Sequence, residues 1–314
     1  SWLKDFLLDK IIIETSVENV SNILLYNELG QIDNSKPFTP FGLNTERGTW
    51  FVVGNYEMSQ KQIKRIDLQI KWQQLPTGEE GLFSYYKDYG QELDSCSFRL
   101  RAKYLSDYDW YDTSNNKLFC LFSTAKKGTD GNTMPRSRLS DESRLTDIRI
   151  ERMFPSIIHE SEYEYSIKSR TGFIRLMLEE PEIGLGEKYY RQLFTDRMVK
   201  KVFQKKESEM LNPPLNPVVD KVTLDYQSQD VIDLRRRKVE GTEVLQLYPF
   251  GYKSVFSGSE SRAMPFLYNL DTADNILFSF TNITRGEVIT LFLDFYQVSI
   301  ECTQQNIPPI VWYW

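Results

Sequence analysis

Alternation of apolar and polar residues is the feature that most constrains how this chain can fold. Residues 66–72, 98–104 and 222–226 each place an apolar side chain at every second position, with polar or charged residues between. A period of two separates the side chains onto the two faces of a strand, so each segment predicts a β-strand with one buried face. Turn residues at 76–78 and 89–90 follow the first segment, which is typical of an antiparallel sandwich.

Further apolar runs predict strands outside this pattern. Residues 118–122 and 172–178 are short and apolar, as expected of buried strands. Residues 276–280 and 288–298 predict two more strands, and the second is apolar on both faces, which is typical of a strand covered on both sides. By contrast, residues 125–147 are rich in Lys, Arg, Ser, Gly and Asp, and we interpret them as a solvated loop.

One amphipathic helix is predicted at about 187–206. Its apolar residues form one stripe of a helix, and they are Tyr190, Leu193, Phe194, Met198 and Val202. Lysines crowd its last turns, where the helix dipole favours cations. Gly184-Leu185-Gly186 has too few glycines for a dinucleotide-binding loop, so we interpret it as a tight turn into the helix. The Pro-rich stretch at 212–217 predicts a stiff linker after it.

Together these elements predict a mainly β chain with two β-sandwich-like domains joined by a mixed segment that holds one amphipathic helix. We expect an N-terminal connecting segment at 1–30, a first sandwich at 31–125, a connector of loop, strand and helix at 126–214, and a second sandwich at 215–314. The periodicity of residues 3–28 is too weak to choose between helix and strand. Both ends of the sequence resemble truncation points, so we expect the native chain to continue beyond them.

Two stretches share one plan, which favours duplication of a single β-sandwich module. The plan is Pro-Phe-Gly, then an apolar strand that ends in Asn, a turn, and a long alternating strand. The first copy comprises Pro40-Phe41-Gly42, residues 50–55 and residues 63–72, and the second comprises Pro249-Phe250-Gly251, residues 277–282 and residues 288–298.

The composition argues against catalysis and against binding to nucleic acid. His159 is the single histidine, so triads and most general-base schemes would compete for one residue, and we interpret it as a surface or structural histidine. The net charge is −6, and the basic run at 235–238 lacks interleaved aromatics, so we interpret it as a solvated or partner-facing turn. We therefore expect no enzyme activity, no small-molecule substrate and no nucleic-acid partner.

Metal, cofactor and membrane roles have no support in the sequence either. Cys96, Cys120 and Cys302 are odd in number and lack the close spacing of a zinc site, so they favour a reducing compartment. We expect no metal site, no cofactor and, since no window approaches about 18 apolar residues, no direct insertion into a membrane.

A glycan-binding β-sandwich module, of an adhesin or a carbohydrate-active protein, is the alternative that the aromatic content leaves open. Aromatic residues make up 14% of the chain, and exposed rings can stack on sugars. The candidates are Trp50, Tyr85, Tyr86, Trp110 and Tyr111. The same rings equally suit cores or protein interfaces. The adjacent acids at 79–80 and 179–180 point to opposite faces of a strand, so neither pair supplies the facing carboxylates of a glycosidase.

Motifs spread over most of the chain resemble a known family. In order, they are Pro40-Phe41-Gly42, 51–54, 66–76, 172–176, Pro181, Gly184, Gly186, Tyr189-Tyr190, Leu193-Phe194, 212–217, 222–226, Pro249-Phe250-Gly251 and 308–314. Their order and spacing resemble the large wedge proteins, related to the baseplate J-like group, of phage-tail-like contractile injection systems, and above all the antifeeding-prophage and Photorhabdus virulence cassette class. The chain departs from the family pattern at Gly186-Glu187, where Gly-His is usual, and at the loop 125–147.

This resemblance implies a structural role in a phage-like, extracellular or type VI secretion-related machine. A wedge subunit assembles around a central hub and relays the contraction trigger to the sheath. Its implied partners are other baseplate wedge subunits, hub or spike proteins and sheath proteins. Its implied location is the bacterial cytoplasm during assembly, then the baseplate of a contractile particle, extracellular or membrane-docked. The candidate interface or motif residues are Pro40, Phe41, Gly42, Trp72, Pro249, Phe250, Gly251, Phe292, Tyr296, Trp312 and Trp314.

Overall fold

A computed structural model describes residues 7–43, 45–124, 137–153, 161–204, 211–234, 244–248, 251–254, 264–265 and 287–296. The fold is mainly β, as the sequence predicts, with 46% of the described residues in strands and 12% in helices. The chain divides into two compact units. The larger unit holds residues 15–229 and 282–288, and the smaller unit holds residues 1–14, 230–281 and 289–314.

Two sheets form the larger unit. The first sheet has the order β1-β11-β5-β9, and the second has the order β3-β2-β4-β10-β6-β7, with β8 also paired to β6. In the first sheet the strands are β1 (Leu7–Val20), β5 (Ile63–Gln73), β9 (Glu142–Arg149) and β11 (Val218–Asp233). In the second they are β2 (Leu24–Asn27), β3 (Gly30–Ile32), β4 (Trp50–Gly54), β6 (Arg99–Ser106), β7 (Asp109–Asp112), β8 (Leu118–Cys120) and β10 (Phe173–Glu180).

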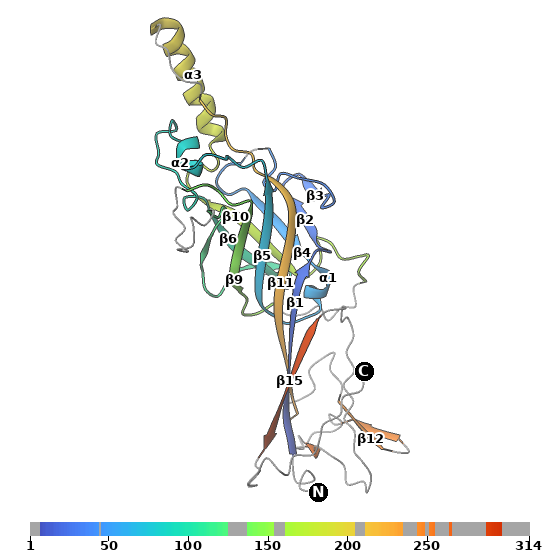
Figure 1. Ribbon diagram of the computed structural model, residues 1–314. Coiled ribbons are helices and arrows are strands. Elements are labelled where there is room, and N and C mark those ends of the chain that lie inside the picture. Colours follow the sequence, from blue (N-terminus) through green and yellow to red (C-terminus); the bar gives the residue numbers. More distant parts are fainter. Residues whose placement is uncertain are drawn as a thin grey trace. The chain divides into compact units, whose positions relative to one another are not determined.

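The alternating residues of both sheets meet in one hydrophobic core. In β5, Ile66, Leu68 and Ile70 are buried, as alternation in the sequence predicts. They belong to the same cluster as Leu100 of β6 and Leu176 of β10, and Figure 1 shows β5, β11 and β9 lying over β4, β10 and β6. Burial of each such side chain contributes roughly 1.5–3 kcal/mol, so the sandwich is held chiefly by this interior.

Three helices are present in the described residues: α1 (Tyr56–Ser59), α2 (Gly81–Tyr85) and α3 (Glu187–Gln204). The side chain of Asn55 caps α1 by accepting a hydrogen bond from the Met58 N–H. Among the described residues, no helix is both long and apolar enough to cross a membrane.

The smaller unit contains shorter pairings. β14 (Met264–Pro265) and β15 (Val288–Tyr296) both pair with β1, while β12 (Leu245–Tyr248) and β13 (Gly251–Ser254) form a two-stranded sheet. Its core comprises Leu8, Ile11 and Leu234, with half-buried residues around them.

Two expectations about the secondary structure need correction or refinement. The interpretation of 125–147 as a loop is wrong over its last part, because β9 begins at Glu142 and buries Leu145. The pairing of β9 with β5 shifts register between Ile66 and Leu68, and Asp147 of β9 has a positive φ of 66°. This irregularity interrupts the alternation of apolar and polar residues, so the sequence pattern does not reveal the strand. The undecided N-terminal stretch contains a strand, β1, instead of a helix.

The sheets do not follow the boundaries expected from the sequence. Strands β9 and β10 lie in the expected connector 126–214, and β11 lies in the expected second sandwich 215–314, yet all three pair within the same two sheets as β4–β8. Of the second copy of the proposed repeat, the long strand is present as Val288–Tyr296, whereas Pro249, Phe250 and residues 277–282 lie outside the described residues.

Candidate interaction site at helix α3

Three tyrosines hold the chain on both sides of α3, and we call Tyr85, Tyr86 and Tyr89 the tyrosine clasp. The Tyr86 hydroxyl donates to the Leu185 carbonyl at 2.8 Å, just before the helix, and accepts from the Leu215 N–H at 3.2 Å, after it. The Tyr89 hydroxyl donates to the Asn212 carbonyl at 2.8 Å, and the Tyr85 hydroxyl to the Pro213 carbonyl at 3.0 Å. The chain that leaves the sandwich at 186 and returns at 211 is therefore anchored at its base.

The clasp requires close packing at two glycines. Gly186 has a φ of +98°, and a Cβ there would lie 2.7 Å from the Tyr89 ring. Gly184 has a φ of +58°, and a Cβ would lie 2.4 Å from the Thr45 carbonyl oxygen. This confirms the interpretation of Gly184-Leu185-Gly186 as a tight turn into the helix. Burial raises the pKa of Tyr86 well above its ordinary value, so its hydroxyl keeps its donor proton.

The first half of α3 packs on the body of the sandwich. Tyr190, Leu193 and Phe194 are half-buried against the main core, and the Arg197 guanidinium pairs with the Asp88 carboxylate at 2.9 Å. At about 100° per residue, these residues share one side of the helix. Figure 1 shows α3 leaving the end of the sandwich near α2 and extending away from the strands.

The second half of α3 presents apolar side chains to solvent. Exposed fractions are 39% for Met198, 49% for Val199, 69% for Val202 and 80% for Phe203. These four residues, the distal apolar face, fall on an arc of about 140° that points roughly opposite to the side packed on the body. No side chain of α3 with a described environment is fully buried. A face of this kind on a helix whose base is fixed is a feature of interaction sites.

Sequence periodicity found only part of this face. It placed Met198 and Val202 on the stripe with Tyr190 and Phe194, as though the whole stripe were buried together. The helix extends beyond the surface on which its first half packs. The stripe is therefore covered in the first half of the helix and exposed in the second. Val199 and Phe203 were missed because they lie off the stripe of four-residue spacing.

The candidate interface residues have several different environments. Pro40, Phe41 and Gly42 are buried, and the Phe41 ring packs edge-on against Phe51 at 5.4 Å. Trp72 is also in the core, where its indole N–H donates to Ser143 Oγ at 2.8 Å. These four residues support the sandwich from within. Their burial leaves them no surface for a partner.

The remaining candidates lie in the smaller unit or outside the described residues. Gly251 begins β13 and is exposed, Phe292 of β15 is exposed, and Tyr296 ends β15. Pro249, Phe250, Trp312 and Trp314, together with His159 and Cys302, lie outside the described residues.

The aromatic candidates for sugar stacking do not form one platform. Tyr85 and Tyr86 belong to the clasp, and Tyr111 stacks on the buried Tyr104 with ring centroids 5.8 Å apart. Trp50 and Trp110 do come together, but the Arg175 guanidinium lies between them, 5.0 Å from the Trp50 ring and 4.0 Å from the Trp110 ring. Sequence reasoning did not anticipate Arg175.

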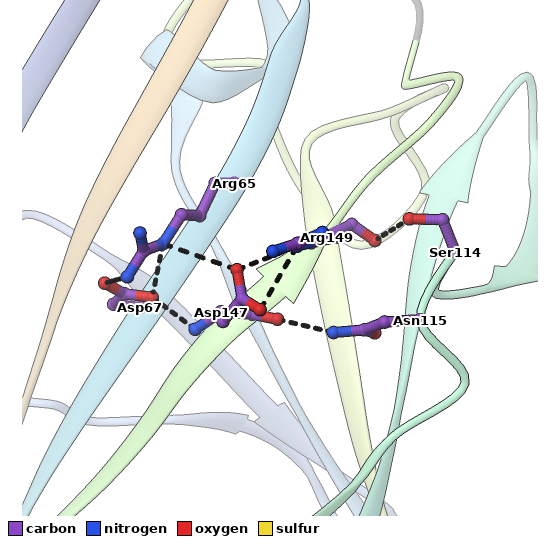
Figure 2. A network of polar contacts seen from close by, with 6 residues as sticks. All are labelled: Arg65, Asp67, Ser114, Asn115, Asp147 and Arg149. Atoms are coloured by element: carbon purple, nitrogen blue, oxygen red, sulfur yellow. Dashed lines mark hydrogen bonds and ion pairs between the residues drawn. The ribbon is translucent and has the colours of Figure 1, made fainter.

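A network of ion pairs links β5 to the edge strand β9 (Figure 2). Arg65 donates to both Asp67 oxygens at 3.1 and 2.7 Å, and Arg149 to both Asp147 oxygens at 2.9 and 3.1 Å. The Asn115 side-chain amide donates to the Asp147 carbonyl at 2.7 Å, which ties the β7–β8 loop to β9. Hydrogen bonding from Arg149 lowers the pKa of Asp147. Such a network protects the edge strand β9 from pairing with another chain.

A second charged cluster is buried beside α1. The Lys61 ammonium donates to the Tyr226 hydroxyl at 2.9 Å and to the Glu287 carboxylate, and it lies 3.9 Å from a Glu57 oxygen. The Tyr226 hydroxyl donates to Glu57 at 3.0 Å, and burial raises its pKa above the ordinary tyrosine value. Each polar group here has a partner, as a buried structural ion pair requires.

In comparisons with known proteins, the chain matches no family model and no curated sequence.

Proposed function

We propose that this chain is a structural subunit of a multiprotein assembly, and specifically a baseplate wedge component of a contractile injection machine. The observation that carries the assembly role is the distal apolar face of α3, exposed on a helix with an anchored base. The identity of the machine rests on the motif resemblance alone. In this role the chain joins other wedge subunits, hub or spike proteins and sheath proteins, and it relays the contraction trigger.

The geometry of α3 supports docking onto a preformed groove. The clasp and the Arg197–Asp88 ion pair fix the first half of the helix, so little orientational freedom is lost when the second half binds. Met198, Val202 and Phe203 supply the apolar anchors of a helix-in-groove contact. A wedge that responds to a trigger needs contacts that exist in two arrangements, and a projecting helix can exchange one groove for another.

The glycan-binding alternative has less support. Sugar rings stack on the faces of aromatic side chains, and the Arg175 guanidinium lies over the rings of both Trp50 and Trp110. Tyr86, another of the candidate rings, is fully buried. A glycan array with the purified protein would revive this alternative if it gave a selective signal.

The test is recovery of particles from cells that co-express the full-length protein with its genomic neighbours. Size-exclusion chromatography with light scattering and negative-stain imaging should place the chain in large ring- or tail-shaped particles. Phe203→Glu should remove it from them while leaving its far-ultraviolet circular dichroism unchanged. Leu29→Glu, at an exposed leucine on the β2–β3 turn, is the matched control and should still assemble. A well-behaved monomer that joins no particle would overturn the proposal.

A further inference from the structure

The outer face of the second sheet carries a guanidinium in an aromatic slot. The register pairs Arg175 of β10 with Val52 of β4 and Lys103 of β6, so Arg175 occupies the centre of the sheet. Trp50 on β4 and Trp110 on β7 approach it from either side, with ring centroids 5.0 and 4.0 Å from its guanidinium carbon. Both distances are within the range of cation–π attraction. The two indoles therefore restrict where the guanidinium can lie.

This cation lacks an anionic partner among the described residues, whereas its neighbours have one. Lys103 pairs with Asp112 at 3.4 Å, and Arg101 with Glu179 at 3.4 Å. The Arg175 side chain has no hydrogen bond or ion pair with the described residues, and its Nε is buried without a partner. Its two Nη atoms also lack a partner but are reached by solvent, since of the three nitrogens only Nε is fully buried.

Burial without a counter-charge leaves part of the energy of desolvation uncompensated. Desolvation lowers the pKa of Arg175, and no opposing carboxylate raises it. The cation–π contacts offset some of this, but they leave the Nη edge free to donate two parallel hydrogen bonds. A planar fork of this kind matches the two oxygens of a carboxylate.

We propose that Arg175, held between Trp50 and Trp110, is a binding site for a carboxylate side chain, Asp or Glu, of a protein partner. The inference deepens the proposed function and rests on it for the source of the carboxylate. A carboxylate on a peptide reaches the Nη edge without needing the ring faces, which the guanidinium occupies. A sugar would need those faces, so an acidic glycan fits less well.

The test is a titration of the purified full chain with a hexaglutamate peptide at low salt, followed by the indole N–H signals in nitrogen-15 NMR spectra. Saturable shifts of Trp50 and Trp110 are expected, and none with hexaglutamine. Arg175→Met should weaken binding by at least about tenfold, because a charge-assisted hydrogen-bond pair is lost. Arg175→Lys should recover part of it, since it restores the charge without the fork.

Arg99→Gln is the matched control, because it removes one positive charge from the same sheet at a residue that already pairs with Glu180 at 3.6 Å. It should change the affinity by less than about twofold. Equal binding by the wild type and Arg175→Met would overturn the proposal, and so would a preference for inorganic phosphate or trigalacturonate over hexaglutamate. The titration needs no other subunit, so its failure is distinguishable from failure to assemble into particles.

Discussion

Tyr86 and Leu185 lie 99 residues apart in the chain and are joined by a hydrogen bond of 2.8 Å from the tyrosine hydroxyl to the leucine carbonyl. The same hydroxyl accepts from the Leu215 N–H on the far side of α3. One side chain thus fixes both ends of the segment that carries the exposed helix. Because the clasp sets where α3 leaves the sandwich, the position of the distal apolar face depends on it.

Removal of this one hydroxyl should loosen the base of α3. Tyr86→Phe leaves a buried carbonyl and a buried N–H unsatisfied, so we expect a loss of about 1–3 kcal/mol in the free energy of unfolding. Urea denaturation measures it, with Tyr163→Phe at a fully exposed tyrosine as the control. Equal midpoints for the two variants would show that the clasp contributes nothing.

The buried lysine cluster should tolerate the loss of its cation poorly. Lys61→Met leaves Glu57 and Glu287 without their shared partner in a buried setting, and we expect a loss of about 3–5 kcal/mol. Lys71→Met, on strand β5, is the control. Its ammonium is largely exposed and pairs with Asp220, so its loss should cost less than about 1 kcal/mol. Thermal and urea unfolding of both variants decide the matter, and similar losses would contradict the prediction.

Alanine substitutions at two glycines distinguish the cost of a left-handed backbone conformation from the cost of a steric clash. Gly90→Ala places a side chain at a φ of +75° with nothing within 4 Å, so it should cost only the left-handed strain, about 1–2 kcal/mol. At Gly184 the alanine would also meet the Thr45 carbonyl, so Gly184→Ala should cost about 2–5 kcal/mol. Denaturant midpoints compare the two. A smaller loss at Gly184 would mean that the turn into α3 can shift freely.

The ion-pair network of Figure 2 should contribute stability that depends on pH. Hydrogen bonding from Arg149 lowers the pKa of Asp147 in the folded chain below its unfolded value of about 3.9. The contribution is therefore complete above that unfolded pKa and is lost as the pH falls through the lower, folded value.

The variant Asp147→Asn removes this titration. Its stability deficit relative to the wild type should be constant from about pH 7 to about pH 5 and should shrink below about pH 4. Urea midpoints measured across this range provide the test. A deficit that stays constant to the lowest pH would contradict the assignment.

Local pattern alone found several core strands and the one long helix. Alternation located β5, β6 and β11, short apolar runs located β8 and β10, and four-residue spacing located α3. These elements were predictable because the period of side chains along a strand or helix is fixed by backbone geometry. The alternation pattern failed to identify β9, because a register shift interrupts the period there. A core strand was therefore not recognised.

What the sequence determined by itself is therefore the mainly β class, the principal strands and the one long helix. Only the tertiary structure decided which aromatic side chains are core and which are exposed, and what lies beside each of them. Trp50, Trp110 and Arg175 are far apart in the chain and meet only because β4, β10, β6 and β7 are neighbours in that order. The physical reason is that periodicity specifies a face, whereas the partner of that face depends on pairing between distant segments, which no local pattern encodes.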